Sequence, residues 1–449
     1  MRFADAVLRL TRWRSVGTSL AIARVFGLKA VFTALNFALV TLAARSLQAD
    51  VFGAYSLLFS AAGLLGIAAT LGQQVLVMRF WSEYLAADRL DLLKGALLFS
   101  AIACVVGCLA FGVPFYLWSA AGHADDVALA VVLYMAMLSL VMTTAHLVRT
   151  ALGIGIGDGV ANVLLALPGA AYLAICLATG MRAELAILFG AMAAGGLLAF
   201  VVHVAALLKS LAARPGFLAM RPAFDLSQWT GRSARLWLSN VLEAANQYLD
   251  VLVIGFLMDP VTAGAWFVMT RLANIVSIAT DAVHMFATRH IPDLYFRGET
   301  VRLGGVLDAA AWVVWLVVVA SVLGIAMAGG WLLAIFNGAY AVHHGVLIVL
   351  SIGAAAGAMA GSSPSLLMLT GHEGRYLAII GGAVALRICG FAVLIPWLGI
   401  AGAAIAVALS QLAMTLLLRR VGKSCTGIDA SALRLAPKLA PALLSARQR

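Results

Sequence analysis

Two apolar runs carry charged residues through their whole length: LWLSNVLEAANQYLDVLVIGFLM at residues 236–258 and AGAWFVMTRLANIVSIATDAVHMFA at residues 263–287. Only the turn DPVT, residues 259–262, separates them. An α-helix rises about 1.5 Å per residue, so about 20 apolar residues cross a hydrocarbon core of about 30 Å. Each run is long enough, and together they predict an antiparallel helical hairpin that crosses a bilayer twice.

The polar residues of this hairpin recur at helical spacing, which places them on one face of each helix. Counting outward from the turn puts Asp250 level with Arg271. A charge at this depth is costly unless it is paired or faces water, so we expect the two polar faces to meet. The residues on these faces are Glu243, Gln247 and Asp250 in the first run and Arg271, Asn274, Asp281 and His284 in the second.

The rest of the chain has the same apolar character. Of its 449 residues, 63% are hydrophobic and 11% are charged, and the mean hydropathy is +1.03. These values exclude an ordinary soluble domain and a disordered chain. Apolar runs of membrane-spanning length recur throughout, and the period-two alternation of outer-membrane barrels is absent. The composition therefore predicts an all-α polytopic membrane protein.

The basic residues are placed as in a protein of the inner membrane. The net charge of +11 would suit nucleic acid, but the cations lie in alternate short connections, and the intervening connections carry only Arg45 and Arg182. This asymmetry follows the positive-inside rule and predicts that both termini are cytoplasmic. The basic connections fall at residues 79–94, 149, 209–235, 289–302, 375 and 419–423.

About twelve spans fit the pattern, and the longest polar connection divides them into two groups of six. Besides the hairpin, we expect spans at residues 25–44, 52–77, 95–117, 127–148, 159–179, 185–208, 306–328, 345–368, 376–396 and 400–418. The predicted domains are an N-terminal six-helix bundle at residues 1–208, a cytoplasmic inter-bundle linker at 209–235, a C-terminal six-helix bundle at 236–420 and a cytoplasmic basic tail at 421–449.

A weak internal repeat supports this division. VFGAYSLLFS at residues 51–60 aligns with TAGAWFVMTR at residues 262–271, so that Gly53 matches Gly264. The same offset places Asn36 over Gln247. Parallel repeats of this kind imply two pseudo-symmetric bundles around a central cavity that holds the substrate.

The chain resembles a known family in these repeated spans and beyond. LVTLAARSLQADVFGAYSLLFSAAGLLGIAATLG, residues 39–72, is similar to the first two spans of polysaccharide flippases of the multidrug, oligosaccharidyl-lipid and polysaccharide exporter superfamily. DVLVIGFLMDPVTAGAWFVMTRLANIVSIATDAVHMFATRHIPDL, residues 250–294, is similar to their seventh and eighth spans. LMLTGHEGRY at residues 367–376 is similar to the connection after their tenth span, and LIPWLGIAGAAIAVALS at residues 394–410 is similar to the turn between their eleventh and twelfth spans. The resemblance covers nearly the whole chain in order.

The resemblance implies a flippase that moves an undecaprenyl-pyrophosphate-linked oligosaccharide across the bacterial inner membrane by alternating access. Such a protein serves surface polysaccharide biosynthesis, for lipopolysaccharide O-antigen or exopolysaccharide, beside a glycan polymerase and other assembly proteins. Family members have a cationic cavity. Guanidinium groups bind phosphate oxygens in pairs. The substrate-binding candidates here are Arg271, Arg387, Lys29, Arg24, Asn36 and Asn274.

The acids of the hairpin have two interpretations. Asp250, Glu243 and Asp281 could couple transport to an ion or gate the cavity, or they could join neighbouring helices through hydrogen bonds. Arg271 could pair with Asp250 or with the substrate. Arg24 lies nearer the inner interface than Lys29, where its side chain could extend to the headgroups.

No sequence motif predicts catalysis, a metal site or a cofactor. GIGIGDG at residues 153–159 lacks the lysine of a P-loop and follows a span rather than a strand, which favours a simple connection. His146, His203 and His284 lack zinc-ligand spacing and are interpreted as packing or interfacial residues. The five cysteines, which lie in apolar spans or in the basic tail, imply no disulfide framework.

Two other functions are weighed against the flippase. An ion-coupled multidrug exporter of the same superfamily should have an acidic cavity, whereas the first span offers Arg24 and Lys29. A membrane glycan ligase or polymerase should have a sizeable outer loop with catalytic residues, and every predicted outer connection is short. We therefore expect a transporter and not an enzyme.

Overall fold

Every regular element in the described part of the chain is a helix. The computed structural model describes residues 16–217, 219–277, 280, 283, 291, 294–295, 297 and 299–435, with the side chains of residues 16–26 and 29 excepted. Its contacts divide the chain into two compact units. The first unit comprises residues 23–264, and the second comprises residues 265–449 together with residues 1–22. The predicted all-α class is confirmed.

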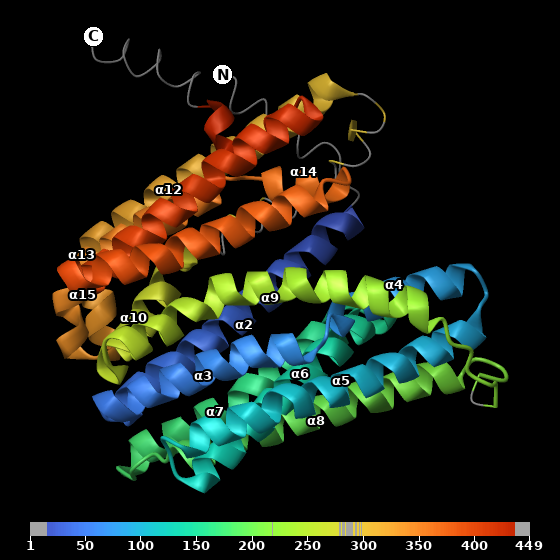
Figure 1. The fold of residues 1–449 in the computed structure, drawn as a ribbon, viewed down its shortest axis with the longest axis horizontal. Coiled ribbons are helices and arrows are strands. Elements are labelled where there is room, and N and C mark those ends of the chain that lie inside the picture. The colour runs from blue at the N-terminus through green and yellow to red at the C-terminus, as the bar shows by residue number, and fades with distance from the viewer. Residues whose placement is uncertain are drawn as a thin grey trace. The chain divides into compact units, whose positions relative to one another are not determined.

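The first unit is a set of long helices that pack side by side (Figure 1). Helix α6 contacts α8, which also contacts α7, and α3 lies against α5, α6 and α9. Their bounds are α2 Val16–Ser46, α3 Ala49–Ala69, α4 Gln73–Ala86, α5 Leu90–Ala120, α6 Asp125–Leu152, the π-helix η1 Gly155–Gly159, α7 Val160–Thr179, α8 Leu185–Ala212 and α9 Leu226–Leu257. Helix α10, Pro260–Ala273, begins in this unit and continues into the next.

In the second unit, α12, α13 and α15 run alongside one another (Figure 1). Helix α13 contacts both α12 and α15, α14 packs on α15, and the short helix η3 packs on α12. The bounds are α12 Thr300–Phe336, the 3₁₀ helix η2 Gly338–His343, α13 His344–Ala358, α14 Ser363–Leu369, α15 Glu373–Thr426 and the 3₁₀ helix η3 Ala432–Leu435.

The described helices are those of a multi-pass membrane protein. Among the described residues, eight helices are long and apolar enough to cross a membrane. Each of the twelve predicted spans overlaps a described helix. The second and tenth predicted spans are each broken in two, and the eleventh and twelfth lie in α15, whose backbone is non-helical at Gly399 (φ 57°, ψ −139°). Helix α10 covers the first half of the eighth span.

One face of α5 shows why these helices suit a bilayer. Ile102, Leu109 and Leu117 recur along this helix and are each more than 60% exposed. Such a stripe would be unfavourable in water, whereas in a membrane it meets lipid chains of the same polarity. Trp118 and Trp331 are also exposed and lie toward the ends of α5 and α12, where tryptophan commonly sits at the membrane interface.

The predicted inter-bundle linker is folded against the first unit. The amine of Lys94 donates to the carbonyl of Met220 at 2.8 Å, and the amide of Ala223 donates to the carbonyl of Asp91 at 3.0 Å. An apolar cluster lies beside these contacts. Helix α9 therefore begins within the first unit. The division of the chain into two six-helix bundles stays a prediction. The cluster comprises Leu76, Val77, Phe80, Trp81, Tyr84, Leu93, Ala96, Leu147, Leu211, Phe217 and Trp229.

The turn between α9 and α10 is a helix cap. One Asp259 carboxylate oxygen accepts from the amide of Thr262 at 2.8 Å, and the other accepts from its hydroxyl at 2.6 Å. Pro260 follows at the first helical position, where its missing N–H costs nothing. Partial burial pushes the pKa of the Asp259 carboxyl up, but the hydrogen bonds from Thr262 and the Val261 amide outweigh it, so the pKa lies below its ordinary value.

Replacing Asp259 by Ala should lower the stability of the detergent-solubilised protein by about 1 kcal/mol. A carboxyl with a lowered folded-state pKa stabilises fully above its unfolded pKa, about 4, and this stabilisation is lost as the pH falls through the folded value. The difference in unfolding temperature from wild type should therefore be full at pH 7 and shrink below about pH 4. Asp259→Asn, which keeps a capping oxygen, is the control; equal losses in both variants would contradict the cap.

Candidate functional site

Helix α9 carries a polar stripe along one side. Arg235, Ser239, Glu243 and Gln247 follow one another at intervals of four residues, so they lie on one helical face. Arg235, Glu243 and Gln247 are exposed, and Ser239 is half-buried. In a membrane fold, polar side chains of this kind face protein or water and not lipid. We therefore expect the stripe to face protein or water.

The opposite side of α9 packs closely on α3 through glycines. A Cβ at Gly63 would lie 2.8 Å from the ring of Tyr248, and one at Gly255 would lie 2.3 Å from the side chain of Leu57. Small residues let membrane helices approach in this way. The repeat-related glycines meet at the end of this contact: a Cβ on Gly264 would lie 3.2 Å from the Cα of Gly53.

Gly53 gives a direct test of this packing, because a Cβ there would lie 2.1 Å from the carbonyl oxygen of Pro260. We expect Gly53→Ala to destabilise the protein by about 1–3 kcal/mol, since backbone must move to admit the methyl group. Gly190→Ala in α8 is the matched control, because nothing lies within 4 Å of its Cβ position. Thermal unfolding in detergent measures both, and equal effects would refute the close approach.

The second predicted span is interrupted between α3 and α4. Leu71 (φ 48°) and Gly72 (φ 78°) have left-handed backbone conformations, which end α3. A break leaves carbonyl groups without helical partners. At this break the carbonyl of Ala68 accepts from the backbone amide of Leu71 at 3.1 Å and from the indole N–H of Trp237 at 2.9 Å. Helix α9 therefore supplies part of the bonding that α3 lacks.

A buried side-chain network completes the bonding at this break. The Ser233 hydroxyl donates to the carbonyl of Leu71 and accepts from the amide group of Gln73 at 2.8 Å. The amide oxygen of Gln73 in turn accepts from the Ser100 hydroxyl at 2.8 Å. Gln73 is fully buried, so these bonds replace those that it would make to water. The network joins α4, α5 and α9.

Ser233→Ala should cost about 1–3 kcal/mol of stability, because it leaves the buried Gln73 amide and the Leu71 carbonyl with only their long 3.4 Å bond to each other. Ser239→Ala, on the half-exposed stripe six residues later, removes only a bond to the carbonyl of Arg235 in its own helix and should change stability by less than about 0.5 kcal/mol. Denaturant unfolding compares the two. If Ser233→Ala were as mild as Ser239→Ala, the network would not support the break.

Asp250 and Arg271 lie in different units. Asp250 is buried, 8% exposed, near the end of α9. Arg271 is half-buried in α10, and its guanidinium lies 4.9 Å from the ring centre of Phe267. The pair between Asp250 and Arg271 stays a prediction.

Arg387 is almost completely buried, at 2% exposure. Its Nε donates to the Ser410 hydroxyl at 3.0 Å, and that hydroxyl donates to the carbonyl of Val407 at 2.8 Å. Arg387 and Ser410 lie on opposite sides of the Gly399 kink, so this bond joins the two halves of α15. In this conformation Arg387 has a structural contact, and its predicted contact with substrate remains to be tested.

The other predicted site residues are placed as follows. Asn36 is exposed on α2 and donates to the carbonyl of Phe32 in its own helix at 3.0 Å. Asn274 is exposed just after α10. Arg24 and Lys29 belong to α2, but their side chains, and all of Asp281, lie outside the described residues.

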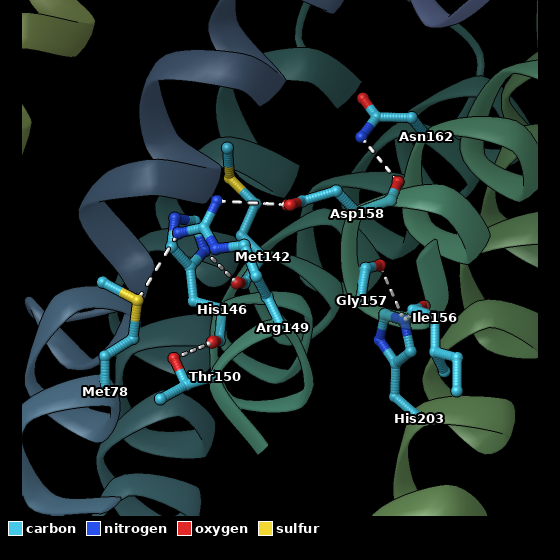
Figure 2. Close-up of polar contacts among 10 residues, drawn as sticks. All are labelled: Met78, Met142, His146, Arg149, Thr150, Ile156, Gly157, Asp158, Asn162 and His203. Atoms are coloured by element: carbon cyan, nitrogen blue, oxygen red, sulfur yellow. Dashed lines mark hydrogen bonds and ion pairs between the residues drawn. The ribbon is translucent and has the colours of Figure 1, made fainter. Parts of the chain in front are cut away.

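The glycine-rich run after α6 is a π-helical turn held by a histidine (Figure 2). Nε2 of the fully buried His203 lies 3.1 Å from the carbonyl oxygen of Ile156 and 3.0 Å from that of Gly157. Carbonyls only accept, so Nε2 carries the proton. Arg149 pairs with Asp158 across the same turn at 3.3 Å. His203 is thus a packing residue, and the run is helical rather than a simple loop.

Comparison with known proteins defines the fold. No protein-family model and no curated protein matches the sequence. An inward-facing multidrug resistance MATE family transporter of the MOP superfamily matches with a TM-score of 0.71 and 13% identity over 88% of this chain and 94% of that chain. The lipid II flippase MurJ, in an inward closed conformation, matches at 0.62 and 12% identity over 88% and 87%.

A third structure is a MOP superfamily transporter from Pyrococcus furiosus, whose binding pocket is described as reversed in polarity. It matches with a TM-score of 0.62 and 12% identity over 90% of this chain and 93% of that chain. All three are transporters or flippases rather than enzymes. At these identities the likeness establishes the fold alone, and this chain has the fold of MOP superfamily transporters.

Of the polar face predicted for α9, Glu243 and Gln247 are exposed and Asp250 is buried. The break between α3 and α4 was not predicted. The signal was present in the adjacent polar pair Gln73 and Gln74, which interrupts an apolar span directly after Gly72. The partners could not be read from the sequence, because Ser100 and Ser233 are far from the break along the chain and reach it only through helix packing.

Proposed function

We propose that this protein is a flippase that translocates an undecaprenyl-pyrophosphate-linked oligosaccharide across the bacterial inner membrane by alternating access. It would serve the assembly of lipopolysaccharide O-antigen or exopolysaccharide, with both termini in the cytoplasm and a glycan polymerase among its partners. The fold supports transport in general, since it is shared with drug transporters and with a lipid II flippase.

The observation that carries the proposal is the combination of this fold with cations inside predicted spans. Arg271 is half-buried in α10, and Arg24 and Lys29 lie in α2. A guanidinium at membrane depth must face water, a counter-ion or a ligand. A pyrophosphate offers two charged groups that match the paired N–H donors of arginine. A cationic drug offers no such match.

A second candidate is an ion-coupled multidrug exporter. It is favoured by the acids of α9, Glu243 and Asp250, because carboxylates in a cavity attract cationic drugs and can bind protons or sodium. The same acids could instead couple glycolipid movement to an ion. The two candidates therefore differ in which charges the substrate needs. A membrane glycan ligase or polymerase is a weaker third candidate.

Transfer of a labelled lipid-linked oligosaccharide between leaflets of proteoliposomes tests the proposal directly. We expect transfer under at least one of a proton gradient, a sodium gradient or a membrane potential. The same vesicles should be assayed for export of a cationic dye. Dye export without glycolipid transfer under any of these gradients would overturn the flippase in favour of the exporter.

Arg271→Ala should slow glycolipid transfer by about tenfold to a hundredfold, because a hydrogen bond to a charged group contributes about 1.5–3 kcal/mol. Arg271→Lys should recover part of the rate, since it keeps the charge but not the paired donors. Arg302→Ala is the control, because this exposed arginine pairs with Glu299 at 2.9 Å at the start of α12. If both Arg271→Ala and Asp250→Ala transferred glycolipid at the wild-type rate, the assigned site would be wrong.

A further inference from the structure

The tenth predicted span is broken between α13 and α14, and the break is closed by a segment from the end of the chain. The amide of Ser362 donates to the carbonyl of Ala430 at 3.0 Å, and the amide of Ala432 donates to the carbonyl of Met359 at 3.0 Å. Both bonds join backbone to backbone. Residues 427–435, which we call the C-terminal strap, therefore supply an acceptor and a donor to the break.

The break is shaped to receive the strap. Gly361 has a positive φ of 61°, and a Cβ at this position would lie 2.6 Å from the carbonyl oxygen of Ala430 and 2.9 Å from the amide of Ala432. Only glycine combines this backbone conformation with so close an approach. The strap itself is well covered, with Ser431 fully buried and Ala432 at 1% exposure.

Asp429 fixes the start of the strap to the last helix. One carboxylate oxygen accepts from Nε of Arg419 in α15 at 2.9 Å. The other accepts from the hydroxyl of Ser431 at 2.6 Å and from its amide at 3.1 Å. Both oxygens are thus used, one to reach α15 and the other to set the turn of the strap.

The other end of the strap is fixed to α12. Arg434 forms an ion pair with Asp308 at 2.8 Å and also donates to the carbonyl of Asp429 at 3.0 Å. The indole N–H of Trp315 donates to the carbonyl of Ala432 at 3.1 Å. An apolar cluster seals the contact. Its members are Ile291, Leu303, Leu307, Leu366 and Ala430, with Leu294, Tyr295 and Ile428 packed against them.

The sequence predicts a cytoplasmic basic tail at residues 421–449. In the structure, α15 continues to Thr426, and the strap turns back at Gly427, which has a positive φ of 73°. From these contacts we propose that the C-terminal strap is a built-in fastener, which joins the α13–α14 break to α12 and to the end of α15. The break, the first half of α12 and the end of α15 then move as one body during any conformational change of the second unit.

Hydrogen exchange on the purified full-length protein tests this fastener without any substrate. Peptides that contain the amides of Ser362 and Ala432 should be protected in wild type. Asp429→Ala should speed their exchange by at least tenfold and lower the unfolding temperature by about 2–4 °C. Arg419→Ala should act in the same direction, because it removes the partner of the same carboxylate.

Arg420→Ala is the matched control. It removes the same charge from the neighbouring position, but its side chain is exposed and takes part in none of the strap contacts given above, so exchange and unfolding temperature should stay at wild-type values. Fast exchange of both amides in wild type, or equal behaviour of Arg419→Ala and Arg420→Ala, would overturn the fastener. These readouts do not depend on transport, so a failed flippase assay would leave the inference standing.

Discussion

A backbone N–H or carbonyl inside a bilayer has no water to bond with, so every interruption of a helix there needs partners from elsewhere in the protein. The described structure has several such interruptions, and each has a different solution. At the break between α3 and α4, side chains of α9 donate to backbone carbonyls, and a hydroxyl of α5 donates to the Gln73 side chain. A buried histidine serves the π-helical turn before α7, and the C-terminal strap serves the break between α13 and α14.

This constraint explains why α9 has two unlike faces. One face must approach α3 closely enough for Ser233 and Trp237 to reach the break, and the glycines of α3 permit that approach. The other face carries the polar stripe, in which Arg235, Glu243 and Gln247 are exposed. A helix that bonds a neighbour on one side and presents polar groups on the other is well suited to the wall of a transport path.

The fold alone does not determine the substrate, because a multidrug transporter and a lipid II flippase share this fold at similar sequence identities to this chain. The choice depends on which charges face the path. In the proposed function, Arg271 is expected to bind the pyrophosphate, and Asp250 and Glu243 of α9 are expected to take part in ion coupling or gating. An arginine in a predicted span need not face the path: the guanidinium of Arg387 is bonded to Ser410 inside α15 and is not exposed in this conformation.

The sequence by itself determined the class of protein, since apolar runs of membrane-spanning length can only be buried in lipid or in other such helices, and it located the spans that the described helices overlap. It also located the polar face of α9, because helical spacing is a local property. Only the tertiary structure decided how the breaks are bonded, that Arg387 is buried, and that residues 427–435 are part of the second unit. The physical reason is that hydrogen bonds between distant segments, such as Gln73 with Ser233 or Ser362 with Ala430, depend on packing that no local pattern encodes.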